Sequence, residues 1–479
     1  VCEPDGLMEK ELISKENERL SSYEKTLSDD DKEELSKRNE FLLKLQSEPD
    51  SEEALATIPC VSKDDIKREV KEIPQEELSM LGAPVLYHDL PTQGIIYLQY
   101  SFDCQSISLE DYQWLALMNS LMLKVGTQDM KYDDFLQEIA CHTGGMSSTV
   151  NIFSTQKNDK GFGCHLWIQT KIMEEKSSEL VSLLKSVFQK IDYTDIQRIK
   201  ELLSSMISRL KTSLQNNGDR TARSFLGASL SKAGFLGNLI SGPEYYKFLK
   251  KIQEDFDESP ENVIKKLNAI RTKLLSRENL LINLTASKKT FEKVKGAVEE
   301  TVNLLPTGKE DEVELELSFS KENTGLVAPG GVQYVAKGLN LKTLGYDGHG
   351  SFDLINQLLS TGYLWERVRV QGGAYGCYLT YDRLSGALIL ASYRDPNLGK
   401  TLDVFNDVGE FLENLELSDI GFEKLLIGTI GRLDTPLTSS QKGKLALNRY
   451  LTGVSTEEIN KFRGQLLDST IDDMRDYAK

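Results

Sequence analysis

The residues best suited to chemistry lie in one stretch, R-V-R-V-Q-G-G-A-Y-G, at residues 367–376. Arg369 and Tyr375 stand on either side of the pair Gly372-Gly373. Both side chains donate hydrogen bonds, and arginine is always charged. Two donors that converge on a carbonyl oxygen can stabilise the negative charge that it gains in a reaction. We therefore predict Arg369 and Tyr375 as catalytic residues, whereas Arg367, on a strand-like approach to the glycines, can serve in a salt bridge.

The residues between these two side chains have two possible roles. Gly372, Gly373 and Ala374 are predicted to bind substrate, because glycines let an extended peptide backbone come close. The alternative is architectural, since a glycine pair lets the chain turn from a helix into a strand. An earlier pair, Gly144-Gly145, favours the architectural role for the glycines alone.

At that earlier pair, Cys141 and Ser147 occupy the places that correspond to Arg369 and Tyr375. The arginine and tyrosine are therefore particular to the later stretch, and we assign the function to them. No Gly-x-Ser-x-Gly elbow is present. The glycine pairs at 330–331 and 372–373 are not phosphate loops, because no Gly-Lys-Ser/Thr follows them.

No metal site is predicted in this chain. No two histidines stand one helical turn apart, so a zinc helix of either orientation is absent from the sequence. The nearest ligand cluster would join Cys141-His142 with Cys164-His165. Neighbours on a strand point to opposite faces, so Cys164 and His165 cannot easily share one ion. We interpret these residues as packed or half-exposed side chains, and His349 as part of an exposed loop.

Bulk composition narrows the class of protein. A chain of 479 residues is too long to fold around a single hydrophobic core, so two or three domains are expected. The 39% hydrophobic and 27% charged content is typical of a soluble globular protein, and no apolar run is long enough for a membrane span. The net charge of −17 argues against a nucleic-acid partner. Six scattered cysteines indicate reduced thiols and a reducing compartment.

Two helices are predicted near the N-terminus, over residues 7–47. Ser28 is the expected N-cap of the second helix, with three aspartates in its first turn. Residues 48–83 are acid-rich and interrupted by prolines, which is typical of a linker. We therefore assign residues 1–83 to a helical hairpin and an acidic linker.

The rest of the sequence shows one pattern twice. Gly144-Gly145 corresponds to Gly372-Gly373, and each pair is followed by a strand, a turn, a second strand and helices. Two α/β repeats are therefore predicted, at residues 84–305 and 306–479. Strand meanders followed by runs of helices indicate the α+β class, with antiparallel-rich sheets and helices packed on one face.

Both ends of the sequence suggest a piece of a longer protein. The chain begins at Val1 without an initiator methionine or a signal-like segment. The first repeat contains a predicted strand at 279–287 between two helices, whereas the second repeat stops in a predicted helix at 472–477. We therefore expect the second repeat to be truncated or abbreviated at its C-terminus.

Two motifs together carry a family resemblance. R-V-Q-G-G-A-Y-G at 369–376, followed by S-Y-R-D-P-N at 392–397, resembles the C-terminal half of the presequence proteases. These enzymes belong to the pitrilysin/insulin-degrading enzyme family of zinc metallopeptidases, as does falcilysin. The resemblance covers essentially the whole chain: the helical hairpin resembles the linker between the two halves of such enzymes, and the repeats resemble their third and fourth domains.

This resemblance implies a fold, an activity and partners. Each half of such an enzyme contains two similar α/β domains, and the halves close around an unstructured peptide. Zinc, its ligands and the general base would belong to an N-terminal catalytic half of the same polypeptide, so this chain would hold no cofactor and would be inactive alone. By their position in the motif, Arg369 and Tyr375 match an arginine and a tyrosine that reach the substrate beside the scissile bond.

Two other functions remain open from the sequence. The chain can be a non-catalytic module that binds extended peptides. It can also be a structural subunit like the core proteins of the respiratory bc1 complex, which keep the fold without the chemistry. The Arg369 and Tyr375 pair argues against a purely structural role. Bacterial cytoplasm, mitochondrial matrix and plastid stroma all suit reduced thiols.

Overall fold

The computed structural model divides the chain into two units, Val1–Ser62 and Lys63–Lys479, which are described separately. Cys2, Pro49, Cys60 and Gly330 are among the residues that lie outside the description. The described residues are 7–48, 50–51, 53–54, 57–59, 61–308, 310–320, 322–327, 331–346 and 348–478.

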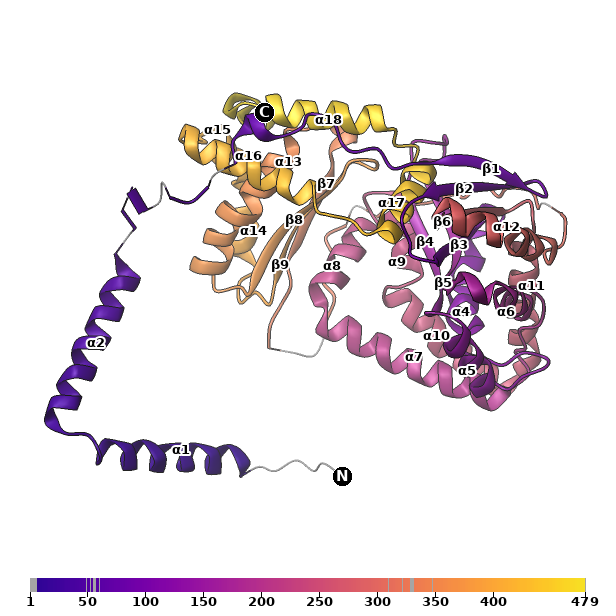
Figure 1. Ribbon diagram of the computed structural model, residues 1–479, viewed down its shortest axis with the longest axis horizontal. Coiled ribbons are helices and arrows are strands. Elements are labelled where there is room, and N and C mark those ends of the chain that lie inside the picture. Colours follow the sequence, from indigo (N-terminus) through magenta and orange to yellow (C-terminus); the bar gives the residue numbers. More distant parts are fainter. Residues whose placement is uncertain are drawn as a thin grey trace. The chain divides into compact units, whose positions relative to one another are not determined.

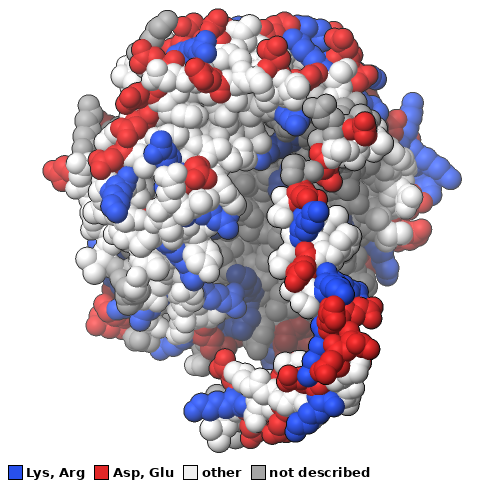
Figure 2. Space-filling view, turned by 90° about the vertical axis from the view of Figure 1, so that its left-hand side faces the viewer, with Lys and Arg blue, Asp and Glu red and all other residues white. Residues whose placement is uncertain are grey.

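The N-terminal unit contains the two predicted helices, α1 (Met8–Glu24) and α2 (Asp29–Ser47). Ser28 caps α2 as expected: its hydroxyl accepts a hydrogen bond from the N–H of Asp31, and the Asp31 carboxylate accepts one from the N–H of Ser28. No residue of either helix is buried, and acidic and basic side chains lie along their surface among uncharged ones (Figure 2). The capping box therefore stabilises α2, whereas α1 begins without a side-chain cap hydrogen bond.

The segment predicted as a linker contains regular structure. A 3₁₀ turn, η1 (Lys63–Asp65), is followed by a strand, β1 (Glu76–Met80), which pairs antiparallel with β2 (Ala83–Asp89). The strand β1 could not be predicted from the sequence, because E-E-L-S-M is largely polar and lies beside prolines. Leu81 and Gly82 both have positive φ angles and make the tight turn between the two strands.

The first sheet has six strands in the part of the chain that the structure describes, in the order β1-β2-β6-β3-β5-β4 (Figure 1). Only β2 and β6 run parallel, and the other neighbouring strands are antiparallel. This confirms the predicted α+β class with an antiparallel-rich sheet. The remaining strands are β3 (Ile95–Asp103), β4 (Met146–Ser154), β5 (Phe162–Met173) and β6 (Leu280–Ala286).

Helices pack against this sheet and enclose the largest hydrophobic core. The rings of Tyr100 and Phe102 on β3 meet Phe188 of α6 edge to face, with centroids 5.6 and 5.8 Å apart. Aromatic pairs of this kind add to the free energy gained from burial. The helices are α4 (Tyr112–Met122), α5 (Tyr132–His142), α6 (Ser177–Gln189), α7 (Ile196–Asn216), α9 (Lys232–Leu239), α10 (Pro243–Glu258), α11 (Pro260–Leu274) and α12 (Lys288–Asn303). A further helix, α8 (Gly218–Gly227), packs instead against strands of the second sheet.

The second sheet consists of three described strands, β7 (Ala336–Asn340), β8 (Gly376–Asp382) and β9 (Ala387–Tyr393). They pair antiparallel in the order β7-β9-β8. In the first sheet, β5 lies between β3 and β4 in the same way. This shared order supports the proposal of two repeats, and the division of the chain at residues 83 and 305 stays a proposal.

Helices of the C-terminal part complete the fold. One of them, α17, packs on the first sheet, where its Leu447 and Leu451 share a buried cluster with Leu86 and Trp167. In the described residues no helix is both long and apolar enough to cross a membrane. The helices are α13 (Phe352–Leu358), α14 (Gly399–Asn406), α15 (Val408–Glu413), α16 (Asp419–Leu433), α17 (Ser439–Thr452), α18 (Thr456–Asp468) and α19 (Ile471–Arg475).

Candidate functional site

The approach to the glycine pair is helical, which corrects the strand predicted there. Trp365–Gln371 forms a π-helical segment, η6, which follows a first such segment, η5 (Leu359–Tyr363). A strand would place Val368 and Val370 on one face, but Val368 is 1% exposed and Val370 is 59% exposed. The alternation of arginine and valine was misleading, because tertiary packing gives this segment a helical period. π-Helical turns are rare and often occur at functional sites.

The two glycines of the pair are required for different structural reasons. A Cβ atom on Gly372 would lie 2.5 Å from the carbonyl oxygen of Val368, so no larger residue fits there. Gly373 has a φ of +78°, in the region that favours glycine. Gly145, the second glycine of the earlier pair, also has a positive φ, of +116°. The glycines therefore have an architectural role, and their contact with substrate stays a proposal.

The turn after these glycines uses its own backbone donors. The N–H groups of Gly373, Ala374 and Tyr375 donate to carbonyl oxygens of the π-helical segment and of β9, at 2.9, 3.1 and 2.9 Å. The side chain of Ala374 is buried in the core. Among the described residues, no donor reaches the carbonyl oxygens of Gly373 and Ala374. A ligand at this turn therefore meets backbone acceptors, while hydrogen-bond donors must come from side chains.

Arg369 and Tyr375 supply such donors from the two sides of the turn. The guanidinium carbon of half-buried Arg369 lies 3.7 Å from the ring centroid of Trp365, and Tyr375 is 70% exposed. Within the described residues, neither the guanidinium nor the phenol hydroxyl has a hydrogen-bond or ion-pair partner. In the first repeat, by contrast, the hydroxyl of Ser147 accepts a hydrogen bond of 2.9 Å from Gln169. The later turn thus leaves both donors available to a ligand.

The loop after β9 is hydrogen-bonded to this turn and holds it in place. The side-chain amide of Asn397 donates to the carbonyl oxygen of Gly372 at 2.6 Å. Asp395 is fully buried, and its carboxylate accepts hydrogen bonds from the N–H of Asn397 at 2.8 Å and from the hydroxyl of Thr401 at 2.7 Å. From the sequence, this loop was recognised only as part of the family motif. The signal that was missed is the Asp-Pro-Asn order, which is typical of a turn held by its own side chains.

Arg394, in the same loop, adds a second unpaired cation. Its φ of +48° is uncommon for a residue with a side chain, and such backbone conformations concentrate at functional sites. Its guanidinium carbon lies 5.9 Å from the ring centroid of Tyr375 and 5.7 Å from that of Tyr393. No described carboxylate pairs with Arg394. Positive charge therefore flanks the turn without a neutralising partner in the described residues.

The cysteine and histidine cluster considered for a metal does not assemble. Cys164 is buried, and its neighbour His165 makes a 2.9 Å hydrogen bond between Nδ1 and the Ser101 hydroxyl. Burial lowers the pKa of His165. On α5, the Nε2 atom of His142 lies 3.4 Å from the carboxylate of Glu138. Among the described residues, no group of three or more His, Cys, Asp or Glu side chains is placed to hold a metal ion.

The surroundings of His349 differ from the exposed loop that was predicted for it. It is half-buried, and its Nδ1 atom lies 2.8 Å from the hydroxyl of Ser351. The Ser351 hydroxyl is in turn 3.0 Å from that of Tyr477. The histidine therefore belongs to a polar network that joins α13 to the end of the described chain.

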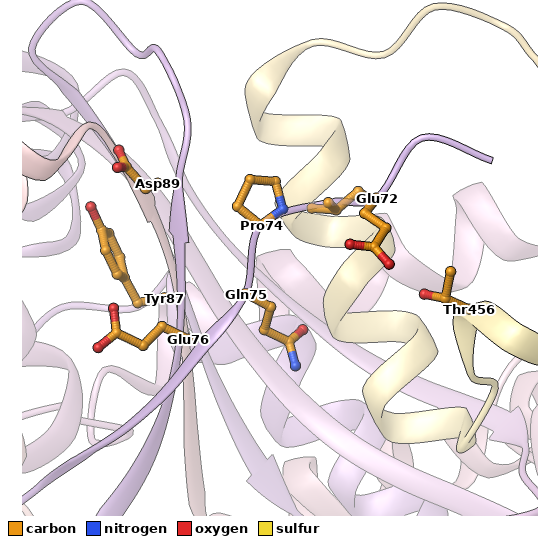
Figure 3. Close-up of a pocket in the computed structure, with 8 residues that line it drawn as sticks. Glu72, Pro74, Gln75, Glu76, Tyr87, Asp89 and Thr456 are labelled. Carbon is orange, nitrogen blue, oxygen red and sulfur yellow. The ribbon is translucent and has the colours of Figure 1, made fainter. Parts of the chain in front are cut away.

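A hollow of about 520 Å³ lies away from the glycine turn, beside the segment that enters β1 (Figure 3). Glu72, Glu76 and Asp89 bring carboxylates to it, and Thr456 lies at the start of α18. Burial, and next the charge of Asp89, raise the pKa of Tyr87 to about 12. No residue predicted as functional from the sequence lines this hollow, so we assign the candidate site to the glycine turn.

Two family profiles match the chain. One describes the region associated with peptidases of family M16, subfamily C, and covers residues 2–252. The other is described as "PreP C-terminal domain" and covers residues 323–479. The second match contains the glycine turn and the loop that braces it.

Relatives and solved structures agree with these matches. Presequence protease 1 of Arabidopsis thaliana is 32% identical over all of this chain and 44% of its own length, and Protein HypA of Clostridium perfringens is 31% identical over 99% of this chain and 48% of its own. The chain thus spans about half the length of these relatives.

The fold also resembles solved structures at low sequence identity. A peptidase M16 inactive domain from Pseudomonas fluorescens has a TM-score of 0.59 at 15% identity, covering 84% of this chain and 94% of that one. A protease from Helicobacter pylori has a TM-score of 0.58 at 14% identity, covering 85% and 96%. The family matches rest on the sequence itself. The chain therefore belongs to the family of regions associated with M16 peptidases of subfamily C and carries a PreP C-terminal domain.

Proposed function

We propose that this chain is the non-zinc-binding C-terminal half of a zinc metalloendopeptidase that degrades unstructured peptides. In this proposal it closes over an N-terminal catalytic half of the same polypeptide, and Arg369 and Tyr375 contact the backbone of the substrate beside the scissile bond. Gly372, Gly373 and Ala374 form the surface on which the peptide backbone lies. Two relatives that cover the chain are named presequence proteases, which supports the substrate class.

One observation carries the proposal. Arg369 and Tyr375 flank a turn whose own N–H groups are already used, and neither side chain has a polar partner among the described residues. A peptide carbonyl oxygen at this turn can accept hydrogen bonds from the guanidinium and from the phenol hydroxyl. The backbone carbonyls of Gly373 and Ala374 can accept hydrogen bonds from peptide N–H groups. The arrangement therefore suits an extended peptide better than a compact ligand.

The two side chains would act on the charge that develops in the reaction. As the scissile carbonyl becomes tetrahedral, its oxygen gains negative charge, and donors that are already in place stabilise it. A guanidinium keeps its positive charge at any physiological pH, and the hydroxyl of Tyr375 is exposed and can rotate to suit the oxygen. In this proposal, the metal and the general base belong to the N-terminal half.

A peptide-binding module without catalysis is the second candidate. It rests on the same free donors and acceptors at the turn, because these would bind a peptide whether or not it is cleaved. A structural subunit of the core-protein type has less support, because scaffolding does not need two donors that have no polar partner among the described residues.

Cleavage of an unstructured fluorogenic peptide separates these functions. The chain alone, with zinc added, should show no turnover, whereas the polypeptide that also contains the N-terminal half should cleave the peptide until a chelator is added. Chelator-sensitive turnover by the chain alone would contradict the proposal. Peptide binding that depends on Tyr375, without cleavage by the longer polypeptide, would establish the binding module instead.

A further inference from the structure

The side chain of Arg369 is held by a ring and not by a carboxylate. Its guanidinium carbon lies 3.7 Å from the ring centroid of Trp365, four residues earlier on the same π-helical segment. Arg463 shows the usual alternative, since both of its terminal nitrogens bind the carboxylate of Asp434 at 2.7 Å. No such partner of Arg369 exists among the described residues. Among the described residues, the indole ring is therefore the main group that restrains the side chain of Arg369.

Core packing does not explain Trp365. This side chain is 44% exposed, whereas Trp167 in the core of the first sheet is 3% exposed. Trp365 therefore gains less free energy from burial than a core tryptophan does. The contact that the structure shows is the stack on Arg369. The helical backbone allows this contact, because residues four positions apart lie on the same side of a helix.

Stacking has a consequence that a salt bridge would not have. The five N–H donors of a guanidinium lie in its plane, and a carboxylate partner occupies two of them and neutralises the charge. A ring that covers the face leaves every in-plane donor free and the charge intact. It also limits the rotamers of a long side chain before a ligand arrives, which lowers the entropy lost on binding.

We propose that Trp365 is a positioning residue that holds the Arg369 guanidinium in the orientation in which it meets the substrate carbonyl. This inference rests on the proposed function, because it deepens the role given there to Arg369. It does not extend to Arg367 or Arg394, for which no such stack on Trp365 is present in the described residues.

The contact can be measured in this chain without any activity. A guanidinium over an indole face shifts the NMR signal of its Hε proton upfield through the ring current. Arg369 should show this shift in the wild-type chain and retain part of it in Trp365→Phe, which keeps an aromatic face. The shift should vanish in Trp365→Leu. An Hε signal of Arg369 that is the same in wild type and Trp365→Leu would overturn the contact.

Peptide cleavage by the longer polypeptide tests the role. Trp365→Leu should lower kcat/KM roughly two- to five-fold, which corresponds to a cation–π contact at an exposed site. Trp365→Phe should recover most of this loss. In an Arg369→Ala background, Trp365→Leu should cause no further loss, because the two residues then act as one unit. Equal losses from Trp365→Leu in both backgrounds would overturn the positioning role.

A matched control comes from another stack in the chain. The guanidinium carbon of Arg198 lies 3.8 Å from the ring centroid of Tyr132, on α5 and far in sequence from the glycine turn. Tyr132→Leu removes a comparable stack and should leave kcat/KM unchanged. If Arg369→Ala itself leaves cleavage unchanged, the proposed function of Arg369 fails, while the NMR shift still decides whether Trp365 holds its side chain.

Discussion

Asn397 and Gly372 are joined by a hydrogen bond of 2.6 Å from the asparagine side-chain amide to the glycine carbonyl oxygen. This bond ties the loop after β9 to the turn that separates Arg369 from Tyr375. The loop itself is fixed by the buried carboxylate of Asp395, which accepts hydrogen bonds from Asn397 and Thr401. The position of the two proposed donors therefore depends on a loop that comes later in the sequence.

Replacing Asn397 by Ala should affect both stability and activity. Loss of one amide-to-carbonyl hydrogen bond should lower the free energy of unfolding by about 1 kcal/mol. Peptide cleavage by the longer polypeptide should fall as well, because the turn loses its brace. Asn414→Ala is the control, since its amide donates to the Glu410 carbonyl at 2.9 Å at the exposed end of α15. Equal cleavage by the two variants would contradict the bracing role.

Alanine substitutions at two glycines should change the free energy of unfolding in opposite directions. Gly373→Ala should lower the free energy of unfolding by about 1–2 kcal/mol, because its φ of +78° is strained for any residue with a Cβ atom. Gly428→Ala, within α16, should raise it by about 0.4–1 kcal/mol, because no heavy atom lies within 4 Å of the added Cβ. Urea unfolding of both variants measures the difference, and a stabilised Gly373→Ala would contradict the turn geometry.

The raised pKa of the Asp353 carboxyl should be visible in the pH dependence of stability. Burial raises the pKa of this carboxyl above its usual value, although Arg383 lies 3.2 Å away and lowers it in part. A raised pKa in the folded state means that the contribution of the group is present below the unfolded pKa, near 3.9, and is lost as the pH rises through the folded value. Asp353→Asn should therefore lose less stability than wild type as the pH rises above the unfolded pKa.

The matched control for this change is Asp472→Asn, since the side chain of Asp472 is 85% exposed. This variant removes the same formal charge from the surface and should keep the pH dependence of the wild type. Unfolding by urea at each pH measures both variants. A pH dependence in Asp353→Asn that equals that of Asp472→Asn would contradict the role of burial at Asp353.

Much of the secondary structure could be predicted because local signals were strong. Ser28 and the aspartates after it predict the start of α2, and the structure shows the capping box there. Gln93 and Gly94 mark the turn between β2 and β3, and both have positive φ angles. In such places the backbone conformation depends on neighbouring residues, so the sequence contains the information needed.

Tertiary effects account for what the sequence did not reveal. The R-V-R-V alternation of residues 367–370 predicts a strand, yet the segment is helical and only Val368 of the two valines is buried. The stack of Arg369 on Trp365 depends on that helical geometry, so it could not be predicted from a strand. The brace between Asn397 and Gly372 joins positions far apart in sequence, which no local pattern reveals.

The central claim is that Arg369 and Tyr375 act on the peptide substrate, and Tyr375→Phe tests it most directly. This change removes one exposed hydroxyl and leaves the ring, so folding should be unaffected. Cleavage of an unstructured peptide by the longer polypeptide should fall on the order of 10²- to 10³-fold in kcat/KM, as for the loss of one donor to a developing oxyanion. Tyr23→Phe, at an exposed position on α1, should cleave like wild type. A Tyr375→Phe variant with the kcat/KM of the wild type would contradict the claim.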